Sequence, residues 1–207
     1  MQTDIPGPAG RLEALIDDPV APSGPPRAAV VFAHPHPQYG GTMHTKVVYQ
    51  AAKALSRIGC AVLRFNFRGV GASAGGFDEG IGEMEDFRAA LQFMQNRHAS
   101  ARLWAGGFSF GSWIALTIGA SDPSVSTLIG IAPPLSRYDF ETVRSSEKPK
   151  FFVQGERDEI CPLKEMREFY ARCSEPKELV VIDAADHLFD GKTSEVGDAL
   201  EDLLGDW

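Results

Sequence analysis

The chain has 207 residues, of which 43% are apolar and 23% charged, and this composition is typical of one globular domain. Its formal net charge of −8 argues against partners such as nucleic acid or an anionic membrane, which require clustered Lys and Arg. No apolar run approaches the roughly 18 residues of a membrane span, and the three cysteines lack the spacing of a disulfide framework. We therefore expect a single cytoplasmic domain over residues 1–207, monomeric or homodimeric, that acts on a small neutral or weakly charged molecule.

Short apolar runs alternate along the chain with longer segments of helical spacing. The predicted strands, each expected to be buried on both faces, are residues 28–33, 61–65, 103–107, 127–131, 151–154 and 179–182. The predicted helices are residues 45–58, 81–97, 109–119, 163–172 and 194–204. This alternation predicts an α/β fold, with a mostly parallel twisted sheet and helices on both of its faces.

Two segments depart from this alternation. Residues 12–17 precede the first parallel strand and are predicted to form an antiparallel strand at the edge of the sheet. Residues 133–148 show no clear periodicity, so their structure is not predicted, and they are too few to form a folded lid.

Residues 107–111, Gly-Phe-Ser-Phe-Gly, fit the pattern G-x-S-x-G. A bare match is weak, but here the motif ends an apolar strand and begins an apolar helix. Glycines two residues on either side allow a strained turn to pass close to neighbouring backbone. The pattern predicts Ser109 as a nucleophile and the Phe110 N–H as an oxyanion donor at the helix N-terminus. The alternative is that Ser109 is a simple helix N-cap.

A serine nucleophile needs a base that is held in place by a third group. His187 follows the strand at 179–182 and is the only histidine in the second half of the chain, so it is the candidate base. Asp158 follows the strand at 151–154, which gives the chain order serine, acid, histidine. Three other carboxylates remain alternatives for the acid: Glu156, Glu159 and Asp186.

The loop at residues 33–44 (AHPHPQYGGTMH) follows the first parallel strand, where a second oxyanion donor is expected. Its two prolines have no N–H, so the donors that remain are the backbone N–H groups of His36, Gln38, Tyr39 and Gly40.

The histidines of the same loop allow a different interpretation. His34, His36 and His44 could form a metal cluster, because His-x-His on a strand directs both side chains to one face. No carboxylate or cysteine stands nearby in sequence, so we favour a structural role for His34, through hydrogen bonds within the loop, and expect no metal.

Residues 66–73 (NFRGVGAS) lack the G-x-G-x-x-G spacing of a phosphate-binding loop and are interpreted as a tight structural loop beside the site. Arg68 in this loop is a candidate partner for Glu83 or Asp86.

Three segments together resemble the α/β-hydrolase superfamily over nearly the whole chain: HPHPQYGGTM from His34, FNFRGVGAS from Phe65, and GFSFG from Gly107. They look like a small, lidless bacterial branch near the dienelactone-hydrolase-like and esterase groups. The resemblance implies an α/β-hydrolase fold without a cap domain, the catalytic residues Ser109, Asp158 and His187, and no cofactor. It also favours the His36 amide, beside that of Phe110, for the oxyanion hole. Dienelactone hydrolases proper have cysteine where this chain has serine, which argues against a dienelactone substrate.

The expected activity is the hydrolysis of small carboxylic esters through an acyl-enzyme, with Tyr39, Gln38 and Phe189 as candidate substrate contacts. The same residues would serve a thioesterase, an amidase or an acyltransferase, because the fold does not set the leaving group. A non-catalytic binding protein on a hydrolase scaffold is the remaining alternative, although such a protein would usually lack the nucleophile or the base.

Overall fold

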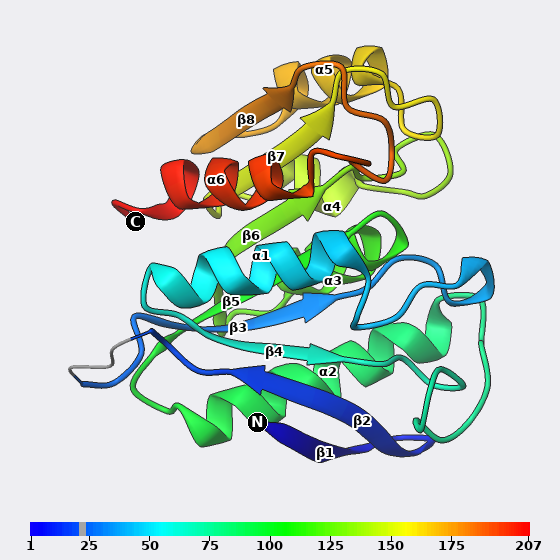
Figure 1. Ribbon diagram of the computed structural model, residues 1–207, viewed down its shortest axis with the longest axis vertical. Helices are drawn as coiled ribbons and strands as arrows, with labels where there is room; N and C mark the ends of the chain where they lie inside the picture. The colour runs from blue at the N-terminus through cyan, green and yellow to red at the C-terminus, as the bar shows by residue number, and fades with distance from the viewer. Residues whose placement is uncertain (21–23) are drawn as a thin grey trace.

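The computed structural model describes residues 1–20 and 24–207, which form one sheet with helices on both sides (Figure 1). The strands are β1 (Gln2–Gly7), β2 (Gly10–Asp17), β3 (Ala28–Ala33), β4 (Ala61–Phe65), β5 (Arg102–Phe108), β6 (Val125–Ile131), β7 (Lys150–Gly155) and β8 (Lys177–Ile182). The helices are α1 (Lys46–Arg57), α2 (Ile81–Arg97), α3 (Phe110–Ser121), α4 (Glu141–Ser145), α5 (Leu163–Arg172) and α6 (Thr193–Leu204), with a short 3-10 helix at Pro37–Tyr39.

The strand order in the sheet is β1-β2-β4-β3-β5-β6-β7-β8. The strands from β4 across to β8 pair in parallel, whereas β1 and β2 pair antiparallel at one end. The predicted α/β fold is therefore confirmed, and each predicted strand and helix is present with bounds that shift by at most two residues. The carboxyl ends of the parallel strands all meet at one edge, which is where an open α/β sheet binds ligands.

Two apolar layers hold the helices on the sheet. One layer packs α1 and α6 against one face, through side chains such as Leu55 and Leu200. The other layer packs α2 and α3 against the opposite face, through side chains such as Phe87 and Leu116. Because the central strands are covered on both sides, their sequences are apolar at nearly every position.

Two expectations need correction, and one segment without a prediction has a defined structure. Residues 12–17 lie in β2, which is not an edge strand, because β1 pairs along its outer side. The sequence pattern of β1 is weak because only Ile5 is buried there. The strand β8 is half-exposed rather than buried on both faces, because it is the last strand of the sheet. The segment at 133–148, for which no structure was predicted, contains the short helix α4.

The loop after β4 is held by a buried ion pair. Arg68 donates from Nε and Nη2 to the two carboxylate oxygens of Asp86, at 3.0 and 2.8 Å, and its backbone N–H donates to the same group at 3.0 Å. The predicted partner Asp86 is confirmed. The other candidate, Glu83, is not the partner, because its carboxylate accepts the backbone N–H groups of Asp78 and Gly80 at the start of α2.

None of the elements described forms a cap domain above the carboxyl edge of the sheet, which confirms the lidless architecture. Within the same residues no helix combines the length and the apolar character needed to cross a bilayer.

Candidate active site

Ser109 lies in a sharp turn between β5 and α3. Its backbone adopts φ 54° and ψ −122°, a conformation that is rare and strained for a residue with a side chain. The Ser109 N–H donates to the carbonyl of Ile131 at 2.9 Å, which fixes the turn to the neighbouring strand β6. The turn thus places the serine hydroxyl at the carboxyl edge of the sheet and at the N-terminus of a helix.

The glycines on either side of Ser109 are required by close backbone contacts. A Cβ atom at Gly107 would lie 2.3 Å from the carbonyl oxygen of Gly111. A Cβ atom at Gly111 would lie 2.4 Å from the carbonyl oxygen of His34 and 2.6 Å from that of Ala33. Because Gly107 and Gly111 lack a side chain, the end of β5 and the end of β3 can both lie in close contact with the start of α3.

Ser109, His187 and Asp158 form a continuous chain of hydrogen bonds. The Ser109 Oγ lies 2.9 Å from His187 Nε2, and His187 Nδ1 lies 2.8 Å from Asp158 Oδ2. An ionised carboxylate only accepts hydrogen bonds, so Nδ1 carries the proton and Nε2 is free to accept the proton of the serine hydroxyl. This is the arrangement in which an imidazole can act as a base toward serine.

The Asp158 carboxylate is held by several donors in the loop after β7. Its Oδ1 accepts the backbone N–H groups of Ile160 at 2.9 Å and Cys161 at 2.7 Å. Its Oδ2 accepts Gln154 Nε2 at 3.0 Å as well as the histidine. These four donors hold both oxygens and leave the carboxylate little freedom to rotate.

The alternative acids have other positions. Glu156 accepts the backbone N–H of Ala184 at 2.9 Å, and Asp186 accepts that of Asp190 at 3.0 Å. Glu159 makes no hydrogen bond with His187. Of the four carboxylates considered, Asp158 is the one that contacts the imidazole.

The sequence analysis did not identify Gln154 as part of this arrangement. Its side chain is fully buried near the end of β7, where Nε2 donates to both Asp158 and the carbonyl of Cys161. The available signal was a polar residue in an otherwise apolar strand end, Phe151-Phe-Val-Gln.

The candidate oxyanion donors can be separated by their hydrogen bonds. In the loop after β3, the backbone N–H of Gln38 donates to His36 Nδ1, that of Tyr39 to the His36 carbonyl, and that of Gly40 to the Pro37 carbonyl. Among the described residues the N–H groups of His36 and Phe110 have no such acceptor. The rings of these two residues are 4.8 Å apart, so the loop lies against the start of α3. Both amides are therefore available to a negatively charged oxygen beside Ser109.

His34 has a structural environment. Its ring is fully buried, Nδ1 donates to the Pro35 carbonyl at 2.6 Å, and Nε2 accepts the backbone N–H of Phe67 at 3.1 Å. Burial lowers the pKa of His34 to about 4, partly offset by the bond to Pro35. The neutral ring links the loop after β3 to the loop after β4. Neither of its nitrogens is free to bind a metal ion together with His36 and His44.

One other group of side chains has ligand-like spacing. Atoms of Asp158, Cys161 and His187 lie within 4.8 Å of one another. Burial, followed by the nearby Asp158 carboxylate, raises the pKa of the Cys161 thiol, so the thiol stays protonated. Because the other two side chains are hydrogen-bonded to each other, this group suits proton transfer better than metal binding.

A cavity of about 430 Å³ opens beside Ser109. It is lined by Pro35, His36, Tyr39, Ser109, Phe110, Pro134, Arg137, Tyr138, Ile160, His187 and Leu188. Tyr39, Ile160 and Leu188 form an exposed apolar rim, at 79%, 47% and 59% of their maximal accessible surface.

Two of the three predicted substrate contacts do not line this cavity. Phe189 is fully buried, with a backbone φ of 53°, and its ring lies 6.2 Å from that of Phe108 in the core. Gln38 is exposed outside the cavity. Sequence reasoning missed six of the lining residues. Pro134, Arg137 and Tyr138 come from the segment whose structure was not predicted, and the other three are Pro35, Ile160 and Leu188.

Comparison with known proteins gives consistent matches. A family model described as an alpha/beta hydrolase domain matches residues 26–205. An uncharacterized protein of Rickettsia prowazekii is 39% identical over 208 residues, which cover 96% of this chain and 86% of that protein. An alpha-beta serine hydrolase homologue from Coxiella burnetii has 38% identity and a TM-score of 0.92, covering 99% of this chain and 97% of its own. A serine hydrolase without lid from Xanthomonas campestris has 34% identity and a TM-score of 0.93, covering 100% and 94%.

The environment of His34 predicts a pH dependence of stability. Its folded pKa of about 4 lies below the usual 6.5, so the unfolded chain takes up the proton first as the pH falls. We expect the contribution of this group to be complete above pH 6.5 and to decrease by about 3 kcal/mol between pH 6.5 and pH 4. The measurement is urea unfolding of the wild type and of His34→Gln at several pH values. The decrease should be smaller in the variant, whereas a matched change at the exposed His44, His44→Gln, should retain it; parallel curves for all three proteins would contradict the assignment.

Proposed function

The chain belongs to the α/β serine hydrolase family, and we propose that it hydrolyses small carboxylic esters through an acyl-enzyme formed on Ser109. The observation that carries the proposal is the unbroken hydrogen-bond chain from Ser109 through His187 to Asp158, at the floor of an open cavity.

In the first half of the reaction, Ser109 Oγ attacks the ester carbonyl carbon while His187 Nε2 takes the hydroxyl proton. The Asp158 carboxylate stabilises the imidazolium that results. The carbonyl oxygen becomes an oxyanion, which the amides of Phe110 and His36 bind; one such donor contributes about 10²- to 10³-fold to the rate of a serine hydrolase.

In the second half, the imidazolium returns its proton to the departing alkoxide, and the alcohol leaves. Water then attacks the acyl-enzyme, with His187 as the base again, and the acid is released as Ser109 regains its proton. Thioester or amide hydrolysis and acyl transfer would pass through the same intermediate. We favour esters over amides because an alcohol leaves more readily than an amine, while thioester hydrolysis and acyl transfer stay alternatives on the same residues.

The size and shape of the cavity support a small substrate. A volume of about 430 Å³ is at the lower end of the range for ligand pockets, and its rim is apolar. No cap domain among the described residues extends this surface, so a long acyl chain would gain few contacts beyond the rim.

The first prediction concerns the nucleophile. Ser109→Ala should lower the turnover of p-nitrophenyl acetate by about 10⁴-fold or more, because no other side chain is positioned to accept the acyl group. Labelling by a fluorophosphonate probe should disappear in the same variant. Ser136→Ala, at an exposed serine outside the cavity, is the control and should retain both; labelling that survives Ser109→Ala would exclude Ser109 as the nucleophile.

The second prediction separates the acids. Asp158→Asn should lower kcat by about 10³- to 10⁴-fold, because an amide cannot stabilise the imidazolium. Asp186→Asn should change kcat by less than about tenfold, because the Asp186 side chain is exposed and bonds only to the nearby backbone. Steady-state kinetics on p-nitrophenyl acetate test both variants, and losses of equal size would argue against Asp158.

The third prediction concerns chain length. In a series of p-nitrophenyl esters from acetate to palmitate, kcat/KM should be highest for acyl chains of two to six carbons and should fall for longer ones. The measurement is made below the aggregation concentration of each ester. A maximum at palmitate would contradict the argument from the cavity.

A further inference from the structure

Arg137 is the one permanent charge among the eleven residues that line the cavity beside Ser109. None of the others is Asp, Glu or Lys, although the whole chain has 28 acidic and 20 basic residues. Most of the lining is apolar or aromatic. Arg137 is therefore the permanent charge that a charged group of a ligand would meet in this cavity.

The backbone of Arg137 is held in a defined turn after β6. Its N–H donates to the Pro134 carbonyl at 3.0 Å. The next residue, Tyr138, stacks on Trp113 of α3, with ring centroids 3.9 Å apart and an angle of 11° between the planes. The turn is therefore anchored to the same helix that begins at Ser109.

Arg137 lines the cavity together with residues of two other loops beside Ser109. His36 and Tyr39 come from the loop after β3, and Ile160 comes from the loop after β7. The turn that carries Arg137 therefore shares one cavity with both of these loops.

Within the described residues the Arg137 side chain has no ion pair and no hydrogen bond. Exposed arginines without partners also occur elsewhere on the surface, for example Arg88 on α2, but that residue does not line the cavity. The free guanidinium of Arg137 is therefore available to a ligand that binds at Ser109.

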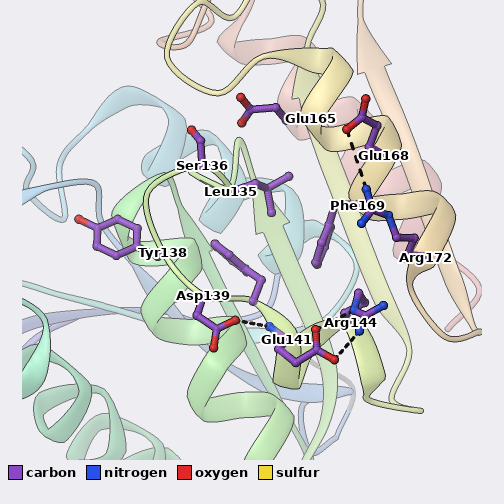
Figure 2. Close-up of a pocket in the computed structure, with 11 residues that line it drawn as sticks. Leu135, Ser136, Tyr138, Asp139, Glu141, Arg144, Glu165, Glu168, Phe169 and Arg172 are labelled. Carbon is purple, nitrogen blue, oxygen red and sulfur yellow. Dashed lines mark hydrogen bonds and ion pairs between the residues drawn. The ribbon is translucent and has the colours of Figure 1, made fainter.

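Figure 2 shows the contrast with a second groove of about 490 Å³, which adjoins the cavity at Tyr138. Both arginines of that groove face carboxylates: Arg144 donates to Glu141 at 2.8 Å, and Arg172 lies 3.9 Å from Glu168. With Asp139 and Glu165, the groove has four carboxylates against two guanidiniums, a net charge of −2. An anion would be repelled there and attracted on the other side of Tyr138, at Arg137.

We infer that Arg137 selects an ester that also carries a carboxylate, by binding that carboxylate while the ester carbonyl lies at Ser109. A guanidinium matches the two oxygens of a carboxylate in a bidentate pair. The side chain is exposed before binding, so little hydration is lost until the substrate covers it. This inference rests on the proposed esterase activity and specifies the substrate class for the same site.

The test compares esters that differ only in charge. Monoethyl glutarate carries the carboxylate on the acyl side, and ethyl 5-methylhexanoate has an isopropyl group in its place. A second pair, 4-acetoxybenzoate and 4-isopropylphenyl acetate, places the same difference on the alcohol side. The kcat/KM ratio of each pair is measured in the wild type, Arg137→Gln and Arg137→Lys. The control is Arg88→Gln, which removes one positive charge, as Arg137→Gln does.

For each pair of esters, the ratio is kcat/KM for the charged ester divided by kcat/KM for the neutral ester. If Arg137 binds the carboxylate, this ratio should be about tenfold or more higher in the wild type than in Arg137→Gln for at least one of the two pairs. Arg137→Lys should keep part of the preference, and Arg88→Gln should keep all of it. The affected pair identifies which side of the ester carries the carboxylate. Equal ratios in the wild type and Arg137→Gln for both pairs would overturn the inference and leave the esterase proposal intact.

A binding measurement keeps the inference testable if no ester is hydrolysed, a result that would refute the proposed function alone. Monoethyl glutarate and 4-acetoxybenzoate are titrated calorimetrically into Ser109→Ala, with and without Arg137→Gln. At least one of them should bind about tenfold more weakly without the arginine. Equal affinities for both would overturn the inference, as would binding of inorganic phosphate as strong as that of either ester, because the site would then not select a carboxylate.

Discussion

The conformation of the chain at Ser109 and the close contact beside it determine how the rest of the site is arranged. A positive φ at a residue with a side chain costs on the order of 1 kcal/mol or more, and the surrounding structure must hold it. Here the bond to Ile131 and the contact between Gly111 and the carbonyls of Ala33 and His34 do so. The same contact draws the loop after β3 against the start of α3. The amides of His36 and Phe110 therefore belong to two segments that pack directly against each other beside the turn of Ser109.

Buried polar groups keep the surrounding loops in place. Two hydrogen bonds join the loop after β3 to the loop after β4: neutral His34 accepts the backbone N–H of Phe67, and Asn66 accepts that of Met43. The ion pair of Arg68 with Asp86 joins the loop after β4 to α2. Each of these groups has its partners, so the low polarity of the interior strengthens the bonds instead of penalising the groups. The loops after β3 and β4 thus form one rigid unit at the carboxyl edge of the sheet.

The periodicity of the sequence was sufficient to predict the parallel strands and most helices, because buried strands and strand–helix turns have strong local patterns. Ser109 was predicted from the G-x-S-x-G motif, and His187 and Asp158 from the order of residues after the later strands. The walls of the cavity were harder to predict. Tyr138 is positioned by Trp113, which is distant in sequence, and residues 133–148 have no periodicity of their own. Phe189 was predicted as a substrate contact from its place near the histidine, but its side chain is buried in the core against Phe108. Contacts between elements and single backbone torsions leave little trace in composition or spacing.

The turn from Pro134 to Tyr138 contributes three residues to the cavity and none to the hydrogen-bond chain of Ser109, His187 and Asp158, whose members follow β5, β8 and β7. One wall of the cavity and the hydrogen-bond chain therefore lie on separate segments of the chain. For enzyme engineering, this makes the turn a suitable place for a sequence library: substitutions restricted to its positions, with the Trp113 stack retained, would vary the wall of the cavity and leave Ser109, His187 and Asp158 unchanged.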